Sequence, residues 1–130
     1  MKKLLGILVL GLLWCNVGFA ISWVKGSATT ENTFYFDPDS IVKDGKFTYV
    51  WILIDTQKIN EDGERSSLLH MKINCKTLQF AMMQIHSYAK QMGKGNPLYS
   101  DNNPKENPAL KSAPPGSAYH NTFKYVCMYK

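Results

Sequence analysis

The chain has 130 residues and a formal net charge of +5, a length typical of a single domain. Its charges are scattered along the sequence, and the excess of basic residues is too small to indicate a nucleic-acid-binding protein. These 130 residues therefore have room for one domain, and their charge argues against a function in DNA or RNA binding.

Residues 1–20 have the order of a secretory signal peptide. Two lysines precede an apolar run of 12 residues, and small residues follow at the positions that precede a signal cleavage site. We expect cleavage between Ala20 and Ile21, which leaves one exported domain at 21–130 with a net charge of +3. An uncleaved membrane anchor is the alternative, because residues 4–24 are nearly all apolar.

The three cysteines divide between the signal peptide and the mature domain. Cys15 is not predicted to carry lipid, because Trp14 is too bulky for the position before an acylated cysteine. The mature chain keeps Cys75 and Cys127, and an even count in an oxidising compartment fits one disulfide. Such a bridge would close a loop of about 50 residues and stabilise the fold by about 4 kcal/mol. Two separate buried thiols are the alternative.

The first half of the mature chain reads as strands joined by tight turns. Short β-prone runs occupy 21–24 and 33–36, and Asp-Pro-Asp-Ser at 37–40 is typical of a turn. Asp-Gly within 43–46 is a hairpin signal. It leads into 47–55, which is apolar on both faces and therefore predicts a central strand covered on each side.

The middle of the chain contains one clear strand and one ambiguous segment. After a turn at 60–64, residues 67–75 alternate between apolar and polar and predict a strand with Cys75 pointing inward. Residues 77–90 fit both a strand and a helix. Their apolar residues alternate in part, but Leu, Met, Ala and Gln favour helices.

The last third begins as a loop and is predicted to end in a helix. Residues 95–116 contain five of the six prolines and predict a long loop with short extended pieces. Ser117 can cap a helix, in which Tyr119, Phe123 and Cys127 share one face. A strand over 123–129 remains the alternative on periodicity alone.

Residues that could support catalysis or bind a metal form no motif. His70, His86 and His120 share no spacing, and each is interpreted as a solvated surface histidine. Asp37 and Asp39 are interpreted as turn residues rather than half of a metal site. A disulfide between the two mature cysteines would also remove both thiols as nucleophiles. We therefore predict no catalytic residue, metal ligand or cofactor.

Four lysines make the long loop and its approach basic: Lys90, Lys94, Lys105 and Lys111. Binding residues concentrate in loops that a rigid scaffold positions, so these lysines are the candidate partner-binding residues. A merely solvated surface is the alternative.

The order of several segments resembles the surface-adhesin protein E family. These segments are "FYFDPDSIVKDGKFTYVWILID", "SLLHMKINC", "SYAKQMGKG" and "PPGS", the last followed ten residues later by Cys127. The resemblance covers nearly all of residues 21–130. It implies an α+β fold, an antiparallel sheet of about six strands with a C-terminal helix packed on one face. It also implies strand at 77–88, helix at 117–129 and a Cys75–Cys127 disulfide that tethers the helix.

The resemblance further implies an exported, non-enzymatic binding module in the envelope of a Gram-negative bacterium. Its partner would be a protein or an envelope polymer, with host extracellular-matrix proteins as one candidate. The alternatives are an envelope partner in the periplasm, a small ligand, a homodimer formed through a sheet edge or, less favoured, a small periplasmic enzyme. The expected location is the periplasm or the cell surface at the outer membrane, without lipid attachment.

Overall fold

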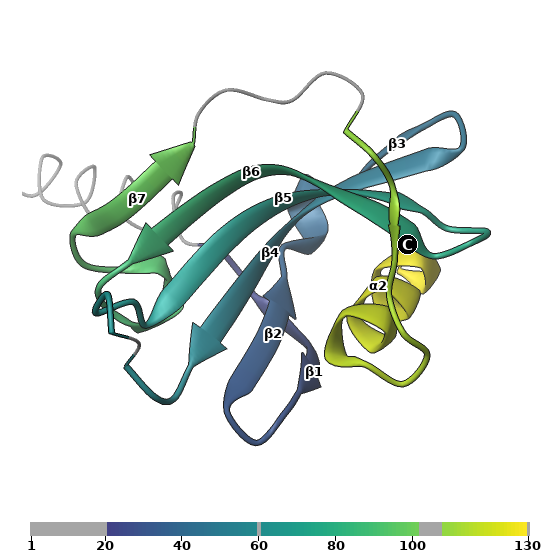
Figure 1. The fold of residues 1–130 in the computed structure, drawn as a ribbon. Helices are drawn as coiled ribbons and strands as arrows, with labels where there is room; N and C mark the ends of the chain where they lie inside the picture. The colour runs from purple at the N-terminus through teal and green to yellow at the C-terminus, as the bar shows by residue number, and fades with distance from the viewer. Residues whose placement is uncertain (1–20, 60, 102–107, 130) are drawn as a thin grey trace, which may run out of the picture.

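The structure, a computed structural model, describes residues 21–59, 61–101 and 108–129. In this part of the chain, eight antiparallel strands form one sheet, and one helix packs against one of its faces (Figure 1). The predicted α+β fold is thus confirmed. The predicted signal peptide lies outside the described residues. The strands are β1 (Val24–Ala28), β2 (Asn32–Phe36), β3 (Val42–Asp44), β4 (Phe47–Thr56), β5 (Ser66–Asn74), β6 (Gln79–Tyr88), β7 (Pro97–Asp101) and β8 (Lys111–Ser112).

The sheet has the order β1-β2-β4-β5-β6-β7, with β3 paired to β4 and β8 paired to β6. β4 lies at its centre, as its apolar sequence predicts. Val50 and Ile52 are fully buried on the face that carries the helix, which we call the helix-side face. The expectation that both faces of β4 are covered is met only in part, because Trp51 on the opposite face stays half-buried.

Two predicted turns hold the first strands in register. The Asp37 carboxylate accepts a hydrogen bond from the Asp39 amide at 3.0 Å and begins the 3-10 turn η1 (Pro38–Ser40). The Ser40 hydroxyl then accepts from the Trp51 amide at 2.9 Å, which fastens this turn to β4. Gly45 takes a φ of +61° in the β3–β4 hairpin, a conformation that favours glycine.

The ambiguous segment is a strand. β6 pairs with β5 along its length and with β7 and β8 on its other edge, so its backbone groups are used in the sheet. The pairing with β5 shifts between His70 and Met71, where β6 contains one extra residue. This bulge explains why the alternation of apolar residues in β6 is imperfect.

The C-terminal segment is the helix α2 (Ala118–Met128). The Ser117 hydroxyl accepts a hydrogen bond from the His120 amide at 3.2 Å and caps the first turn, as predicted. Phe123 and Val126 are fully buried against the sheet. The predicted disulfide joins Cys127 to Cys75, 52 residues earlier, with the two Cα atoms 5.7 Å apart.

The helix covers the sheet unevenly. It packs against β1 and β2, so closely that a Cβ on Gly26 would lie 2.7 Å from the Thr122 methyl group. It reaches β6 mainly through the Tyr119 and Phe123 rings, which contact Phe80. Among the described residues, the helix-side face therefore has a covered half over β1, β2 and β4, and an open half over β6 and β7.

A short connection covers part of the opposite face. The 3-10 turn η2 (Gln91–Gly93) contacts β4 and β5. The Met92 amide donates to the Asp55 carboxylate at 3.0 Å, and the Gly93 amide donates to the Ser66 hydroxyl at 2.9 Å. This connection lies over Leu53, which is fully buried.

Candidate functional site

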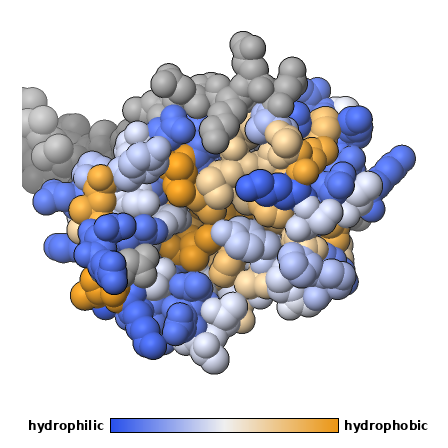
Figure 2. Space-filling model, viewed as in Figure 1, coloured by the Kyte–Doolittle hydropathy of each residue, from blue (hydrophilic) through white to orange (hydrophobic). Residues whose placement is uncertain are grey.

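The open half of the helix-side face contains an apolar recess of about 510 Å³. Figure 2 shows apolar surface in the middle of this face, with hydrophilic side chains toward its edges. The recess lies where β6, the start of α2 and the segment before β8 meet. Its lining is apolar apart from one lysine and one tyrosine hydroxyl, and consists of Phe80, Ala81, Met82, Pro108, Ala109, Lys111 and Tyr119.

Tyr119 is held in place by three aromatic rings. Its ring meets Phe34 edge-on at 5.0 Å between centroids, and lies parallel to Phe80 at 5.7 Å. Phe123, one helical turn later, is the third neighbour at 5.9 Å. Burial raises the pKa of the Tyr119 hydroxyl, which therefore stays protonated and can donate a hydrogen bond. A rigid, amphipathic side chain thus forms one wall of the recess.

Tyr119 also borders a second depression, which we call the acidic hollow, with a volume of about 770 Å³. The floor of this hollow includes Ile54 of β4 and Ser67 of β5, and the Ser67 hydroxyl donates a hydrogen bond to Glu64. Acidic side chains from two loops surround it, and only one lysine accompanies them. The charged residues of the lining are Glu31, Lys58, Glu61, Asp62 and Glu64.

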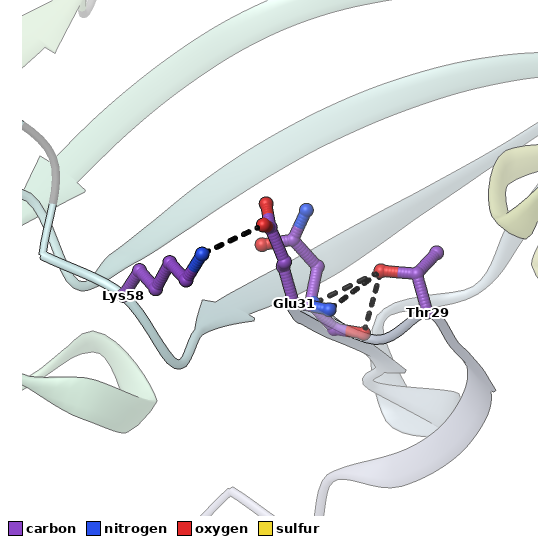
Figure 3. Close-up of polar contacts among 4 residues, drawn as sticks. Thr29, Glu31 and Lys58 are labelled. Carbon is purple, nitrogen blue, oxygen red and sulfur yellow. Dashed lines mark hydrogen bonds and ion pairs between the residues drawn. The ribbon is translucent and has the colours of Figure 1, made fainter.

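One ion pair fixes part of the rim of this hollow. Lys58 lies 3.3 Å from Glu31, across the gap between the β4–β5 loop and the β1–β2 turn (Figure 3). The Thr29 hydroxyl accepts from the Glu31 amide at 3.3 Å and from the Asn32 amide at 3.0 Å, which orders the turn that carries Glu31. Both charged side chains are largely exposed, so the pair orients the loops more than it stabilises the fold.

The candidate lysines do not lie together. Lys90 and Lys94 belong to the connection after Tyr88, and the Lys90 amide donates to the Lys94 carbonyl at 3.1 Å. Lys111 pairs with Phe80 at the other end of β6 and lines the apolar recess. Tyr88 lies eight positions after Phe80, about 26 Å along an extended strand. Lys105 is outside the described residues, and partner binding by these lysines stays a prediction.

The opposite face carries an aromatic cluster. His70 stacks on Trp51 with centroids 4.6 Å apart, and His86 lies 6.0 Å from the same indole. Burial lowers the pKa of His70, so the neutral imidazole is favoured in the fold. The interpretation of His70 as a freely solvated residue is therefore wrong. His120, expected on the exposed side of its helix, is half-buried.

Of the residues that line the apolar recess, sequence reasoning named only Lys111 as a candidate for binding. Phe80 and Met82 belong to the segment whose periodicity fitted two structures, and Tyr119 was assigned to the helix face but not to a site. Their apolar character was visible, but the pairing of β8 with β6 that places Lys111 beside them was not. The cysteine pair, by contrast, was predicted correctly.

The described residues show no arrangement of chemical groups that indicates a particular reaction. They hold no group of three or more His, Cys, Asp or Glu side chains suited to a metal ion. Over residues 21–59, 61–101 and 108–129, no helix has the length and hydropathy needed to cross a membrane. What the geometry offers is surface for binding, in two adjoining depressions of different character.

Comparison with known proteins gives one family. The sequence profile described as surface-adhesin protein E matches residues 23–128. No curated protein sequence matches at a significant level. Among solved structures, crystal form II of Haemophilus influenzae protein E superposes with a TM-score of 0.59 and 16% identity, covering 80% of this chain and 95% of that one. Protein E from non-typeable Haemophilus influenzae gives a TM-score of 0.57 and 16% identity, covering 81% and 74%.

At this identity the structural matches establish the fold, while the profile match spans nearly the whole described domain. The profile match supports an adhesin-like binding module. The chain belongs to the surface-adhesin protein E family.

Proposed function

We propose that this chain is an exported, non-enzymatic module that binds a segment of a partner protein on its helix-side face. The apolar recess carries the proposal, because an open, apolar depression beside charged rims is typical of protein-binding surfaces. Family membership supports the same role.

The two depressions on either side of Tyr119 define the kind of segment that fits. An apolar or aromatic side chain would enter the recess between Phe80 and Met82. A lysine or arginine nearby in the partner would face the acidic hollow, where Glu61 and Asp62 add to the negative charge. The partner segment is therefore apolar with an adjoining basic residue, a combination that uses both depressions at once.

Which partner the protein meets depends on whether it lies on the cell surface or in the periplasm. The family name and the protein E structures favour adhesion, so host extracellular-matrix proteins are the first candidate partners. An envelope protein in the periplasm is the second candidate. Protease treatment of intact cells, with a periplasmic protein as control, separates them. Loss of the chain supports a surface adhesin, and protection until the outer membrane is opened supports an envelope partner.

The recess is tested by adding a charge to it. Met82→Lys should lower binding to a panel of immobilised extracellular-matrix proteins, because the buried part of the interface would then contain an unpaired ammonium group. Met83→Lys is the matched control, since Met83 is the neighbouring half-buried residue and does not line the recess. Equal loss in both variants, or no loss in either, would contradict the recess as the binding site.

The lysines are tested separately, because they lie in two places. Lys111→Glu should weaken binding to an acidic part of the partner at low salt, because Lys111 lines the recess. The double change Lys90→Glu and Lys94→Glu should have less effect. A larger effect of the double change would indicate that the partner binds at the β6–β7 connection.

A small apolar ligand is the second candidate function. The recess volume of about 510 Å³ lies in the range of small-molecule sites. Mass spectrometry of the protein purified from cells, before and after denaturation, would detect a co-purified ligand. Its loss in Met82→Lys but not in Met83→Lys would assign it to the recess.

A further inference from the structure

The two ends of the sheet differ in charge. The β4–β5 loop and the β1–β2 turn, which form one end, carry the acidic residues of the hollow described above. The β3–β4 and β5–β6 turns form the other end, because Phe47 at the start of β4 pairs with Asn74 at the end of β5. This second end carries Lys43, Lys46, Lys72 and Lys76. We call these four residues the basic tip.

The charge of the basic tip is concentrated. Within residues 42–48 and 72–77 the four lysines are accompanied by one acidic residue, Asp44. Two of the ammonium groups are positioned by a ring, since the Nζ of Lys46 lies 5.3 Å and that of Lys72 4.1 Å from the Phe47 centroid. The tip therefore holds part of its positive charge in a defined place.

A small recess opens at the basic tip beside the disulfide. It has a volume of about 240 Å³ and is lined by Lys43, Lys46, Lys76, Gly45, Thr48, Cys75 and Cys127. Three lysines thus line a space large enough for a phosphate-sized anion, and lysine binds phosphate as a compact point charge. The disulfide brings the end of α2 to this same place.

Exposed apolar side chains adjoin the lysines. Val42, next to Lys43, is 58% exposed, and Met128, next to Cys127, is 77% exposed. Figure 1 shows the two turns and the end of the helix on the same side of the molecule. Basic residues with neighbouring exposed apolar side chains are the composition of surfaces that bind anionic membranes. A soluble acidic polymer would use the lysines but would leave Val42 and Met128 without a role.

We infer that the basic tip docks on an anionic membrane, with lipid phosphates in the recess and Val42 and Met128 at the level of the headgroups. The acidic end then points away from the membrane. The apolar recess on the helix-side face is lined by other residues, so this inference is independent of the proposed function.

The test is flotation of the protein with vesicles of phosphatidylcholine, with and without phosphatidylglycerol. The protein is purified from the cell envelope, so that every variant has the same naturally processed N-terminus. Binding is expected only to the vesicles that contain phosphatidylglycerol, and it should weaken as salt is added. Changing Lys43, Lys46 and Lys76 to Gln should lower the partition coefficient roughly a hundredfold, at about fivefold for each lysine.

The matched control changes Lys25, Lys90 and Lys94 to Gln. These residues are exposed and lie outside the basic tip, so the net charge falls equally while binding should change by less than about fivefold. The double change of Val42 and Met128 to Ser should weaken binding severalfold and leave its salt dependence unchanged. Unchanged thermal unfolding of each variant shows that the fold is intact.

Three results would overturn the inference. Equal binding to both kinds of vesicle would show that the anionic lipid is not recognised. Equal loss in the control triple variant would assign binding to net charge alone. No vesicle binding, together with tip-dependent retention on heparin, would show that the tip takes a soluble acidic polymer instead.

Discussion

The covered and open halves of the helix-side face are built from the same kind of sheet and differ in what lies on them. In the covered half, Phe36 of β2 and Ile52 of β4 are fully buried beneath α2. In the open half, Tyr99 of β7 is 57% exposed. The difference shows that the position of the helix decides which apolar residues become core and which remain available for binding.

The size of the helix explains why it cannot cover both halves. α2 has 11 residues, which makes it about 16 Å long. Six neighbouring strands span about 24 Å across the sheet. The Cys75–Cys127 bridge holds the end of the helix at the β5–β6 turn, and the close contact of Thr122 with Gly26 holds its middle on β1. The open half follows from these two anchors.

Removing the disulfide should lower the free energy of unfolding more than any other change proposed for the covered half. Cys75→Ser releases the end of α2, and we expect the free energy of unfolding to fall by about 4 kcal/mol, because the bridge closes a loop of about 50 residues. Urea unfolding of the variant, and of the wild-type protein with and without reductant, measures the effect. Identical midpoints in all three samples would mean that the bridge does not stabilise the fold.

Forcing the helix away from β1 should cause the next largest fall in the free energy of unfolding. Gly26→Ala places a Cβ 2.7 Å from the fully buried Thr122 methyl group, and we expect a loss of about 2 kcal/mol. Adding Thr122→Ala should restore part of it. The Thr122 hydroxyl has no hydrogen-bond partner among the described residues, so its removal breaks no such bond there. A double variant as unstable as Gly26→Ala would argue against this contact as the cause.

The same change from Ile to Val, made once in each half, tests how tightly the two halves are packed. Ile52→Val removes a fully buried methylene and should lower the free energy of unfolding by about 1 kcal/mol. Ile85→Val, on half-buried β6, should cost less than about 0.5 kcal/mol. Chemical denaturation of both variants gives the difference. Equal costs would mean that the open half is as tightly packed as the covered half.

The smallest expected effect concerns the opposite face of the sheet. Burial lowers the pKa of His70 below its ordinary value of 6.5. The unfolded chain therefore takes up a proton first, so the contribution of neutral His70 to stability is complete above pH 6.5 and is lost as the pH falls. His70→Gln should lose less stability than the wild-type protein between neutral and mildly acidic pH. Parallel stability curves for the two proteins would contradict this.

Local sequence patterns were sufficient where one segment determines its own structure. The alternation of β5, the Asp-Gly hairpin before β4 and the Ser117 cap each predicted an element that the structure contains. The even cysteine count of residues 21–130 favoured the disulfide that joins Cys75 to Cys127. These features depend on backbone conformation and residue chemistry within a few positions, which a sequence displays directly.

The candidate sites depended on pairing between distant segments. Residues 79–88 became a strand through pairing with β5 and β7, although their periodicity also fitted a helix. Register alone placed His70 opposite Trp51 and separated Lys111 from Lys90. The apolar recess formed because α2 stops short of the open half. Sequence by itself determined the elements, and tertiary structure decided which residues meet, because a one-residue change of register moves every side chain to the other face of the sheet.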